Sequence, residues 1–275
     1  MSSSGPSASF TSDPNDGWSE FHRRWSRLTP PLRPSPDVVG AMAAQIAGRD
    51  ARVLLLGVTP ELCDIAQETV AVDHSANMIA RVWPGDTPSR KAVLADWRSL
   101  PAMRADFSAA IGDGSLNAVS YADYPAVFAQ LARVLAPGAR IAFRVYETPQ
   151  HCEAVAQLRD DVMAGRERRF HAFKWRLAMA LASERQNPDL PVALIYDVFS
   201  RVFADNQALL GATGWSGADL AEMEAYRGRD TRYSFPTRHQ LLAALPAQFK
   251  NAQFPSSGRY ALAERCPIFA ADFMP

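Results

Sequence analysis

The sequence predicts an α/β protein whose mostly parallel sheet is covered by helices on both faces. Short apolar runs alternate with helical patterns between residues 52 and 145, an order typical of parallel sheets that are buried on both sides. The run Arg52–Leu56 leads into a tight turn at Gly57, and a second run, Thr69–Asp73, ends on a carboxylate. A strand, a turn and a second strand ending in an acid form the opening unit of an open sheet that binds ligands where its strands end.

The N-terminal part precedes this alternation. Residues 1–16 are rich in Ser, Pro, Gly and Asp and are expected to form a disordered leader. In residues 17–48, apolar side chains first recur at helical spacing, a proline-rich stretch at 29–34 should run extended, and a helix is expected over 36–46. We expect residues 17–48 to dock on the sheet as a helical lid segment.

Residues 49–150 are expected to form the core. The five predicted strands are Arg52–Leu56, Thr69–Asp73, Ala92–Ala95, Ser108–Ile111 and Arg140–Val145. Thr59 and Ser75 stand where their hydroxyls can cap helices after the first two strands. A third helix, Tyr124–Leu135, is amphipathic and ends before Pro137.

Beyond the core the pattern changes. Residues 151–235 show helical patterns only, so we expect a helical cap or insertion there. In residues 236–275 a helix is expected to start at Pro236, followed by strands over 249–254 and 266–273. These two strands would complete the core as an antiparallel terminal pair.

Composition limits the classes of partner. The 275 residues are 48% hydrophobic and 21% charged, with a formal net charge of +0, which gives no reason to expect a nucleic acid or an acidic membrane. Three widely spaced cysteines form no metal cluster and no disulfide framework, as in a reducing cytosol. Neither a signal peptide nor an apolar run of membrane-spanning length is found. We therefore expect a cytoplasmic protein with no metal site, while its oligomeric state is not determined by the sequence.

The turn after the first expected strand has one glycine where a dinucleotide site has three. Thr59 and Leu62 stand at the later positions, so the backbone cannot approach a pyrophosphate closely. A nucleoside ligand without phosphates, such as S-adenosylmethionine (SAM), needs no such approach. The carboxylate of Asp73 could hold the ribose diol of that ligand.

Six stretches follow one another in an order that carries a family resemblance. They are Leu55–Glu61, Val70–Asp73, His74–Ile79, Ala95–Trp97, Ile111–Gly114 and Leu131–Arg140. Together they resemble the motifs of the class I, Rossmann-like SAM-dependent methyltransferases, over roughly residues 52–145 and the closing strands. The resemblance implies transfer of a methyl group from SAM to an acceptor, which we expect to be a small molecule. The fourth-strand motif lacks the Asn/Asp-Pro-Pro-Tyr/Phe pattern of enzymes that methylate exocyclic amines of bases or side-chain amides, which counts against DNA adenine and protein glutamine.

The resemblance also implies which residues bind SAM. Asp73 would hold the ribose hydroxyls, Met78 would pack on adenine, and Asp96 would bind the adenine amino group. The full set assigned to the cofactor is Gly57, Val58, Thr59, Asp73, His74, Met78, Asp96, Trp97, Gly112, Asp113 and Gly114. From the N-terminal segment we add Trp25 and Arg33 as a lid over the pocket, with Arg33 pairing with the SAM carboxylate.

Simpler structural roles stay open for several of these residues. Asp96 could form a surface pair with Arg98, and Trp97 could pack in the core. Gly112 and Gly114 could serve only the turn that leaves the fourth strand.

Methyl transfer from a sulfonium is an in-line displacement, so the protein must mainly hold the nucleophile and the methyl group in line. An acceptor hydroxyl or protonated amine also needs a base that takes its proton. Asp113, at the end of the fourth strand, is the first candidate for that base. His151 and Tyr146, just beyond the fifth strand, are second choices.

Two other functions compete with this interpretation. A non-catalytic module that senses SAM or scaffolds a partner is consistent with the glycine-poor turn and the lack of an obvious base. An NAD(P)-binding oxidoreductase is disfavoured because the glycines of a pyrophosphate site are missing.

Overall fold

The computed structural model of the chain describes residues 22–275. The leader expected over residues 1–16 and the start of the lid segment, residues 17–21, lie outside the described residues. A 3-10 helix, η1 (His22–Arg27), ends the segment where helical spacing is predicted. The predicted helix after the proline-rich stretch is present as α2 (Pro36–Gln45).

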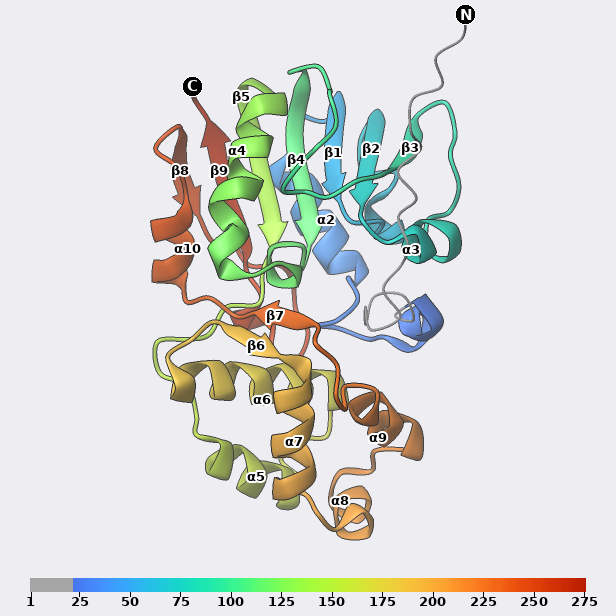
Figure 1. The fold of residues 1–275 in the computed structure, drawn as a ribbon, viewed down its shortest axis with the longest axis vertical. Coiled ribbons are helices and arrows are strands. Elements are labelled where there is room, and N and C mark those ends of the chain that lie inside the picture. The colour runs from blue at the N-terminus through green and yellow to red at the C-terminus, as the bar shows by residue number, and fades with distance from the viewer. Residues whose placement is uncertain (1–21) are drawn as a thin grey trace, which may run out of the picture.

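Within residues 22–275, seven strands form one sheet in the order β3-β2-β1-β4-β5-β9-β8 (Figure 1). Their bounds are β1 (Arg52–Leu56), β2 (Glu68–Asp73), β3 (Arg90–Leu94), β4 (Phe107–Asp113), β5 (Leu135–Arg144), β8 (Phe249–Gln253) and β9 (Ile268–Phe273). The first five pair in parallel, and β9 runs antiparallel to both β5 and β8. This topology confirms the predicted Rossmann-like sheet with an antiparallel terminal pair.

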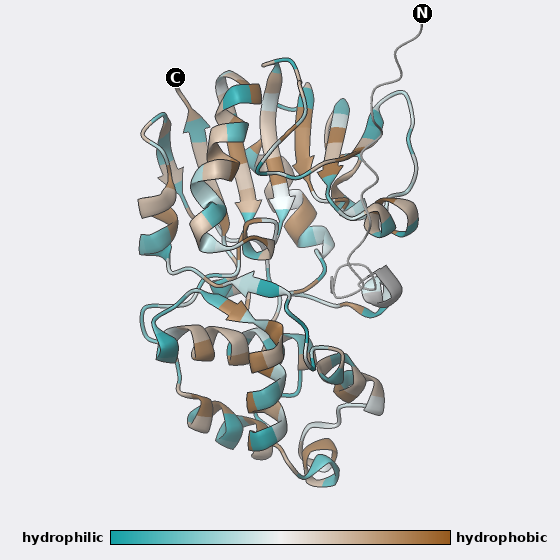
Figure 2. Cartoon of the chain, in the orientation of Figure 1, coloured by the Kyte–Doolittle hydropathy of each residue, from teal (hydrophilic) through white to brown (hydrophobic). Residues whose placement is uncertain are grey.

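Alternate side chains of the central strands enter two separate hydrophobic cores. Leu54 and Leu56 pack in the core that contains the helix α4 (Tyr124–Val134). Val53 and Leu55 pack in the core that contains α2. All four side chains are buried, because successive residues of a strand point to opposite faces of the sheet. Figure 2 shows these central strands largely in the hydrophobic colour, as a sheet covered on both faces requires.

Further helices surround the sheet. They are α3 (Ala76–Arg81), α10 (Arg238–Ala244) and the 3-10 helices η2 (Pro60–Leu62), η3 (Leu116–Ala118), η4 (Tyr121–Asp123) and η5 (Ala263–Arg265). Ser75 caps α3 as predicted, because its hydroxyl accepts a hydrogen bond from the backbone N–H of Met78 at 3.3 Å. The helix predicted to begin at Thr59 is wrong, since only the short η2 forms there. The link between β1 and β2 is shorter than the dozen or more residues that a parallel crossover normally takes, which leaves no room for a full helix.

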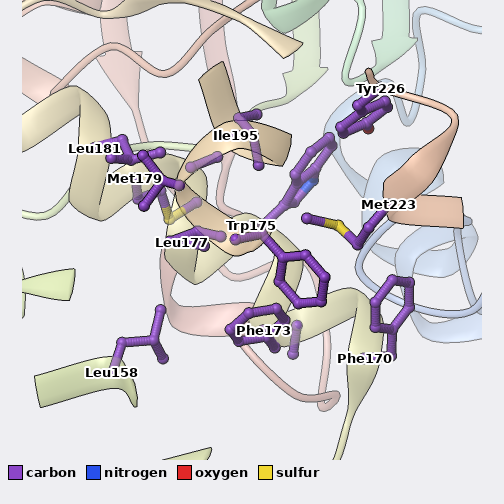
Figure 3. Close-up of a cluster of buried hydrophobic side chains, with 14 of the residues drawn as sticks. Leu158, Phe170, Phe173, Trp175, Leu177, Met179, Leu181, Ile195, Met223 and Tyr226 are labelled. Carbon is purple, nitrogen blue, oxygen red and sulfur yellow. The ribbon is translucent and has the colours of Figure 1, made fainter. Parts of the chain in front are cut away.

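A helical cap lies against the carboxyl ends of the parallel strands (Figure 1). Its elements are α5 (Val155–Met163), α6 (Phe170–Arg185), α7 (Val192–Val202), α8 (Asn206–Thr213), α9 (Gly217–Glu224), β6 (Asp189–Pro191) and β7 (Arg232–Ser234). The cap has its own hydrophobic core around α6, where Phe173, Trp175 and Met223 gather (Figure 3). The prediction that the cap contains only helices is incomplete, because β6 and β7 pair antiparallel. The sequence does not reveal these strands, since three residues are too few to show an alternating pattern. Every helix of the described part of the chain is too short or too polar to cross a membrane.

Candidate active site

One cavity lies between the sheet, the cap and the N-terminal segment. Its walls come from the residues that end or follow β1, β2, β4 and β5, from α6 and β7 of the cap, and from residues 25–33, which we call the strap. The cavity encloses about 80 Å³. In open α/β sheets, ligands bind at this place, outside the carboxyl ends of the strands.

Gly57 and Trp97 form one wall of the cavity. Gly57 has φ +99°, a value that favours glycine, and its N–H donates to the carbonyl of Val72 at 2.8 Å. The indole N–H of Trp97 donates to the same carbonyl at 2.6 Å. A side chain at Gly57 would begin 3.9 Å from the Trp97 ring. Trp97 packs in the core, as its simpler structural role requires, and it also lines the cavity.

Asp73 and Met78 form the neighbouring wall. Asp73 is 7% exposed and lines the cavity, so its carboxylate is not directed into bulk solvent. One of its oxygens accepts the backbone N–H of Ser75 at 2.8 Å, which fixes the carboxylate at the turn between β2 and α3. Met78 lines the same end of the cavity. Val58 and Thr59, which follow Gly57, also line it.

Asp113 lies at the end of β4, in an ion pair with Arg144 of β5. The guanidinium binds both carboxylate oxygens, and the second contact, between Nη2 and Oδ2, is 2.9 Å. Burial raises the pKa of the Asp113 carboxyl, and the charge of Arg144 acts against that shift. Arg144 also donates to the carbonyl of Pro31 at 2.7 Å, to the hydroxyl of Tyr260 at 3.0 Å and to the hydroxyl of Tyr146 at 3.4 Å. The carboxylate of Asp113 is therefore committed to a guanidinium that also holds the strap.

Tyr146 lies beside Gly114 in the floor of the cavity. Gly114 has φ +66°, and a Cβ there would lie 2.8 Å from the Tyr146 ring, so only glycine permits this approach. The Tyr146 hydroxyl donates to the carbonyl of Pro31 at 3.1 Å. Burial raises the pKa of this hydroxyl well above its ordinary value, so the group keeps its proton.

The strap is anchored in its middle and at its C-terminal end. Its Thr29 N–H donates to Nδ1 of His171 in the cap at 3.1 Å. Arg33 donates to Glu61 at 2.5 Å and lies 5.8 Å from the ring centroid of Trp25. Trp25 lines the cavity, whereas Arg33 does not. The strap therefore covers the cavity with the ring of Trp25, while its Arg33 is bound to Glu61 outside the cavity.

Besides Arg33, four predicted site residues lie away from the cavity lining. The side chain of His74 is 47% exposed, 3.8 Å from Asp73, and His151 is exposed beyond β5. Asp96 forms the surface pair with Arg98 at 2.6 Å, and this arginine lowers the pKa of Asp96. Gly112 has no room for a side chain, because a Cβ there would overlap the hydroxyl of Ser115. The predicted residues that the structure brings to the cavity are Trp25, Gly57, Val58, Thr59, Asp73, Met78, Trp97, Asp113, Gly114 and Tyr146.

Two lining residues come from the cap and are absent from the sequence-based set. Trp175 of α6 and Tyr233 of β7 face the cavity opposite the strand ends. Residues 170–182 of α6 are buried at all positions but one, so no amphipathic pattern distinguishes a cavity-facing residue from a core residue. Tyr233 lies in a three-residue strand that carries no recognisable period. No local signal identifies either residue.

No protein-family model and no curated protein matches this chain. Among solved structures, a Rhodobacter sphaeroides protein assigned to the Zn-dependent alcohol dehydrogenases covers 96% of this chain and 99% of its own, at 11% identity and a TM-score of 0.56. A possible exported protein from Bordetella parapertussis covers 94% of this chain and 79% of its own, at 14% identity and a TM-score of 0.50. The 1,6-didemethyltoxoflavin-N1-methyltransferase of Burkholderia thailandensis covers 98% and 94%, at 15% identity and a TM-score of 0.49.

At these identities the likeness to solved structures shows a shared fold only. The chemistry has to be inferred from the residues of the site. The five parallel strands have the order 3-2-1-4-5 that a Rossmann-like dinucleotide sheet also has, and the sheet differs from it by the antiparallel β9, which lies between β5 and β8. Within residues 22–275 no group of three or more His, Cys, Asp or Glu side chains is placed to hold a metal ion.

Proposed function

We propose that the chain is a SAM-dependent methyltransferase that acts on a small-molecule acceptor. The observation that carries this proposal is the position of Asp73. Its carboxylate lies at the end of β2, beside the Gly57 turn, and lines the cavity at the carboxyl ends of the strands. A carboxylate at this point can accept hydrogen bonds from both hydroxyls of a ribose.

The other walls at this end fit the remainder of a nucleoside. Met78 and the ring of Trp97 offer apolar surfaces on which a flat base can pack. A single glycine at the turn fits a ligand that brings no pyrophosphate. The enclosed 80 Å³ is below the roughly 300–1,000 Å³ typical of ligand sites. We therefore propose that the strap, which covers the cavity, moves outward when the ligands enter.

SAM, when bound, supplies a methyl group activated on a sulfonium. The contribution of this chain is to orient the acceptor and to exclude water, through the strap and the rings around the cavity. The carboxylate of Asp113 is bound by Arg144, and the hydroxyl of Tyr146 donates a hydrogen bond to the carbonyl of Pro31. We propose that both act as positioning residues.

Two observations bear on the competing functions. The reversed β9 and the turn with one glycine both weigh against an NAD(P)-binding oxidoreductase. A non-catalytic SAM-binding module would share the whole site, so turnover of labelled SAM with a metabolite extract separates it from an enzyme. The three free cysteines support our proposal of a cytoplasmic location.

Calorimetric titration with SAM and with its demethylated product, S-adenosylhomocysteine (SAH), tests the proposal. We expect micromolar binding and a rise in Tm by mass action. Asp73→Asn should weaken SAH binding by about 10- to 100-fold, the effect of losing hydrogen bonds to a charged group. Asp96→Asn is the matched control, because Asp96 also follows a strand but pairs with Arg98 at the surface. The proposal is contradicted if neither SAM nor SAH binds. It is also contradicted if the two variants weaken SAH binding equally.

A further inference from the structure

We propose that the acceptor is a flat ring compound without a negative charge that carries a ring nitrogen or a carbonyl oxygen, bound against Tyr146, Trp175 and Tyr233. This inference rests on the proposed function, because it concerns the second ligand of the same cavity. It concerns the cap end, away from Asp73 and Met78.

Three rings from separate elements form the cap end of the cavity. The centroids of Trp175 and Tyr146 are 5.4 Å apart, with an interplanar angle of 55°. Those of Trp175 and Tyr233 are 5.2 Å apart, at 69°. All three residues line the cavity, and Trp25 of the strap lines it as well. Aromatic pairs in such arrangements gain about 0.5–1.5 kcal/mol beyond the burial of their area, so these walls favour a flat ring over an aliphatic chain.

The charges of the lining exclude an anionic acceptor. Among the described residues that line the cavity there is no Lys, Arg or His, so an anion would find no opposite charge. The two acids of the lining are Asp73 and Asp113, of which Asp113 is paired with Arg144. An anionic ring would therefore lose its hydration without compensation, which is costly in a buried site.

Trp175 adds a polar requirement. Its side chain is 1% exposed, and its indole N–H has no hydrogen-bond partner within the described residues. A buried donor left without a partner costs about 1–3 kcal/mol. In the same cap the indole N–H of Trp215 donates to the carbonyl of Arg168 at 2.9 Å. Because Trp175 lines the cavity, a ligand with a nitrogen or oxygen acceptor atom can supply the missing partner.

Two probes of nearly equal shape test the charge. Benzamide is neutral and carries a carbonyl oxygen, and benzoate is an anion. Their affinities are measured by ligand-observed NMR on the full chain saturated with SAH, after SAH binding has been established by calorimetry. We expect benzamide to bind at least 10-fold more tightly than benzoate.

Two tryptophan variants locate the binding. Trp175→Phe keeps a ring but removes the N–H, and should weaken benzamide by about 2- to 10-fold while SAH affinity is retained. Trp215→Phe is the matched control, because Trp215 packs in the cap core against Phe170 and Phe173 and does not line the cavity. It should leave benzamide affinity unchanged. Tm and SAH affinity of each variant show whether it folds.

The outcomes separate the two proposals. If SAH binds and benzamide binds no better than benzoate, the acceptor class is wrong and the proposed function stands. Equal losses of benzamide affinity in the two tryptophan variants also overturn the acceptor class, since they would reflect a disturbed cap. If SAH does not bind, both proposals fail.

Discussion

Replacing Asp113 by Asn removes the charge that balances Arg144 in the interior. The exposed fractions of the two side chains are 3% and 0%. Arg144 cannot turn to solvent, because it also donates to Pro31 and to Tyr260. Removing one partner of a buried ion pair costs about 3–5 kcal/mol, a large part of the roughly 5–15 kcal/mol by which a protein is stable. We expect Asp113→Asn to lower the free energy of unfolding by about that amount.

Urea denaturation followed by tryptophan fluorescence measures this loss. Asp96→Asn is the control, because the side chains of Asp96 and Arg98 are 37% and 48% exposed and surface pairs contribute about 0–1 kcal/mol. A loss below about 1 kcal/mol for Asp113→Asn would refute the reasoning, since the pair would then be hydrated in solution.

A double variant distinguishes a positioning role from a proton-accepting role of Asp113. Arg144→Met in the Asp113→Asn background removes the unpaired charge, so part of the lost stability should return. If Asp113 only holds the site in shape, methyl transfer returns with the stability. If it accepts the proton of the acceptor, the double variant folds and remains inactive.

Two further changes test the cap and the cavity floor. Burial favours the neutral form of Glu222, but Lys174 and His171 outweigh it and hold the pKa of Glu222 at about 2. This carboxylate therefore stabilises the fold above its unfolded pKa of about 4.5, and we expect about 3 kcal/mol to be lost as the pH falls from about 4.5 to about 2. Glu222→Gln should remove that dependence in acid denaturation, whereas Glu224→Gln, at a half-exposed side chain, should keep it. Gly114→Ala and Gly138→Ala share a positive φ, but only the first meets a ring. Thermal unfolding should therefore show Gly114→Ala less stable by at least about 1 kcal/mol, and equal losses would contradict the close approach.

The parallel strands and the coverage of both sheet faces were predictable from the sequence. Each central strand carries a continuous apolar run, and a run of that kind is stable only where both faces of the strand are buried. The Gly57 turn and the carboxylate of Asp73 were predictable for the same local reason, because each directly follows such a run. After Thr59 only the three-residue η2 forms, since the link to the next strand is short and the Thr59 hydroxyl makes no capping hydrogen bond.

The sequence by itself determined the sheet, the coverage of both its faces and the positions of the Gly57 turn and of Asp73, since these depend on patterns within a few neighbouring residues. Only the tertiary structure decided the cap end and the state of the charges. Asp96 turned to Arg98 and Asp113 to Arg144, and both acids end or follow a strand, so local pattern cannot tell them apart. Trp175 meets Tyr146 and Tyr233, and Arg144 meets Pro31 across 113 residues of chain. Contacts between segments so distant in the sequence depend on how the layers pack, so they cannot be predicted from local hydrophobic periodicity.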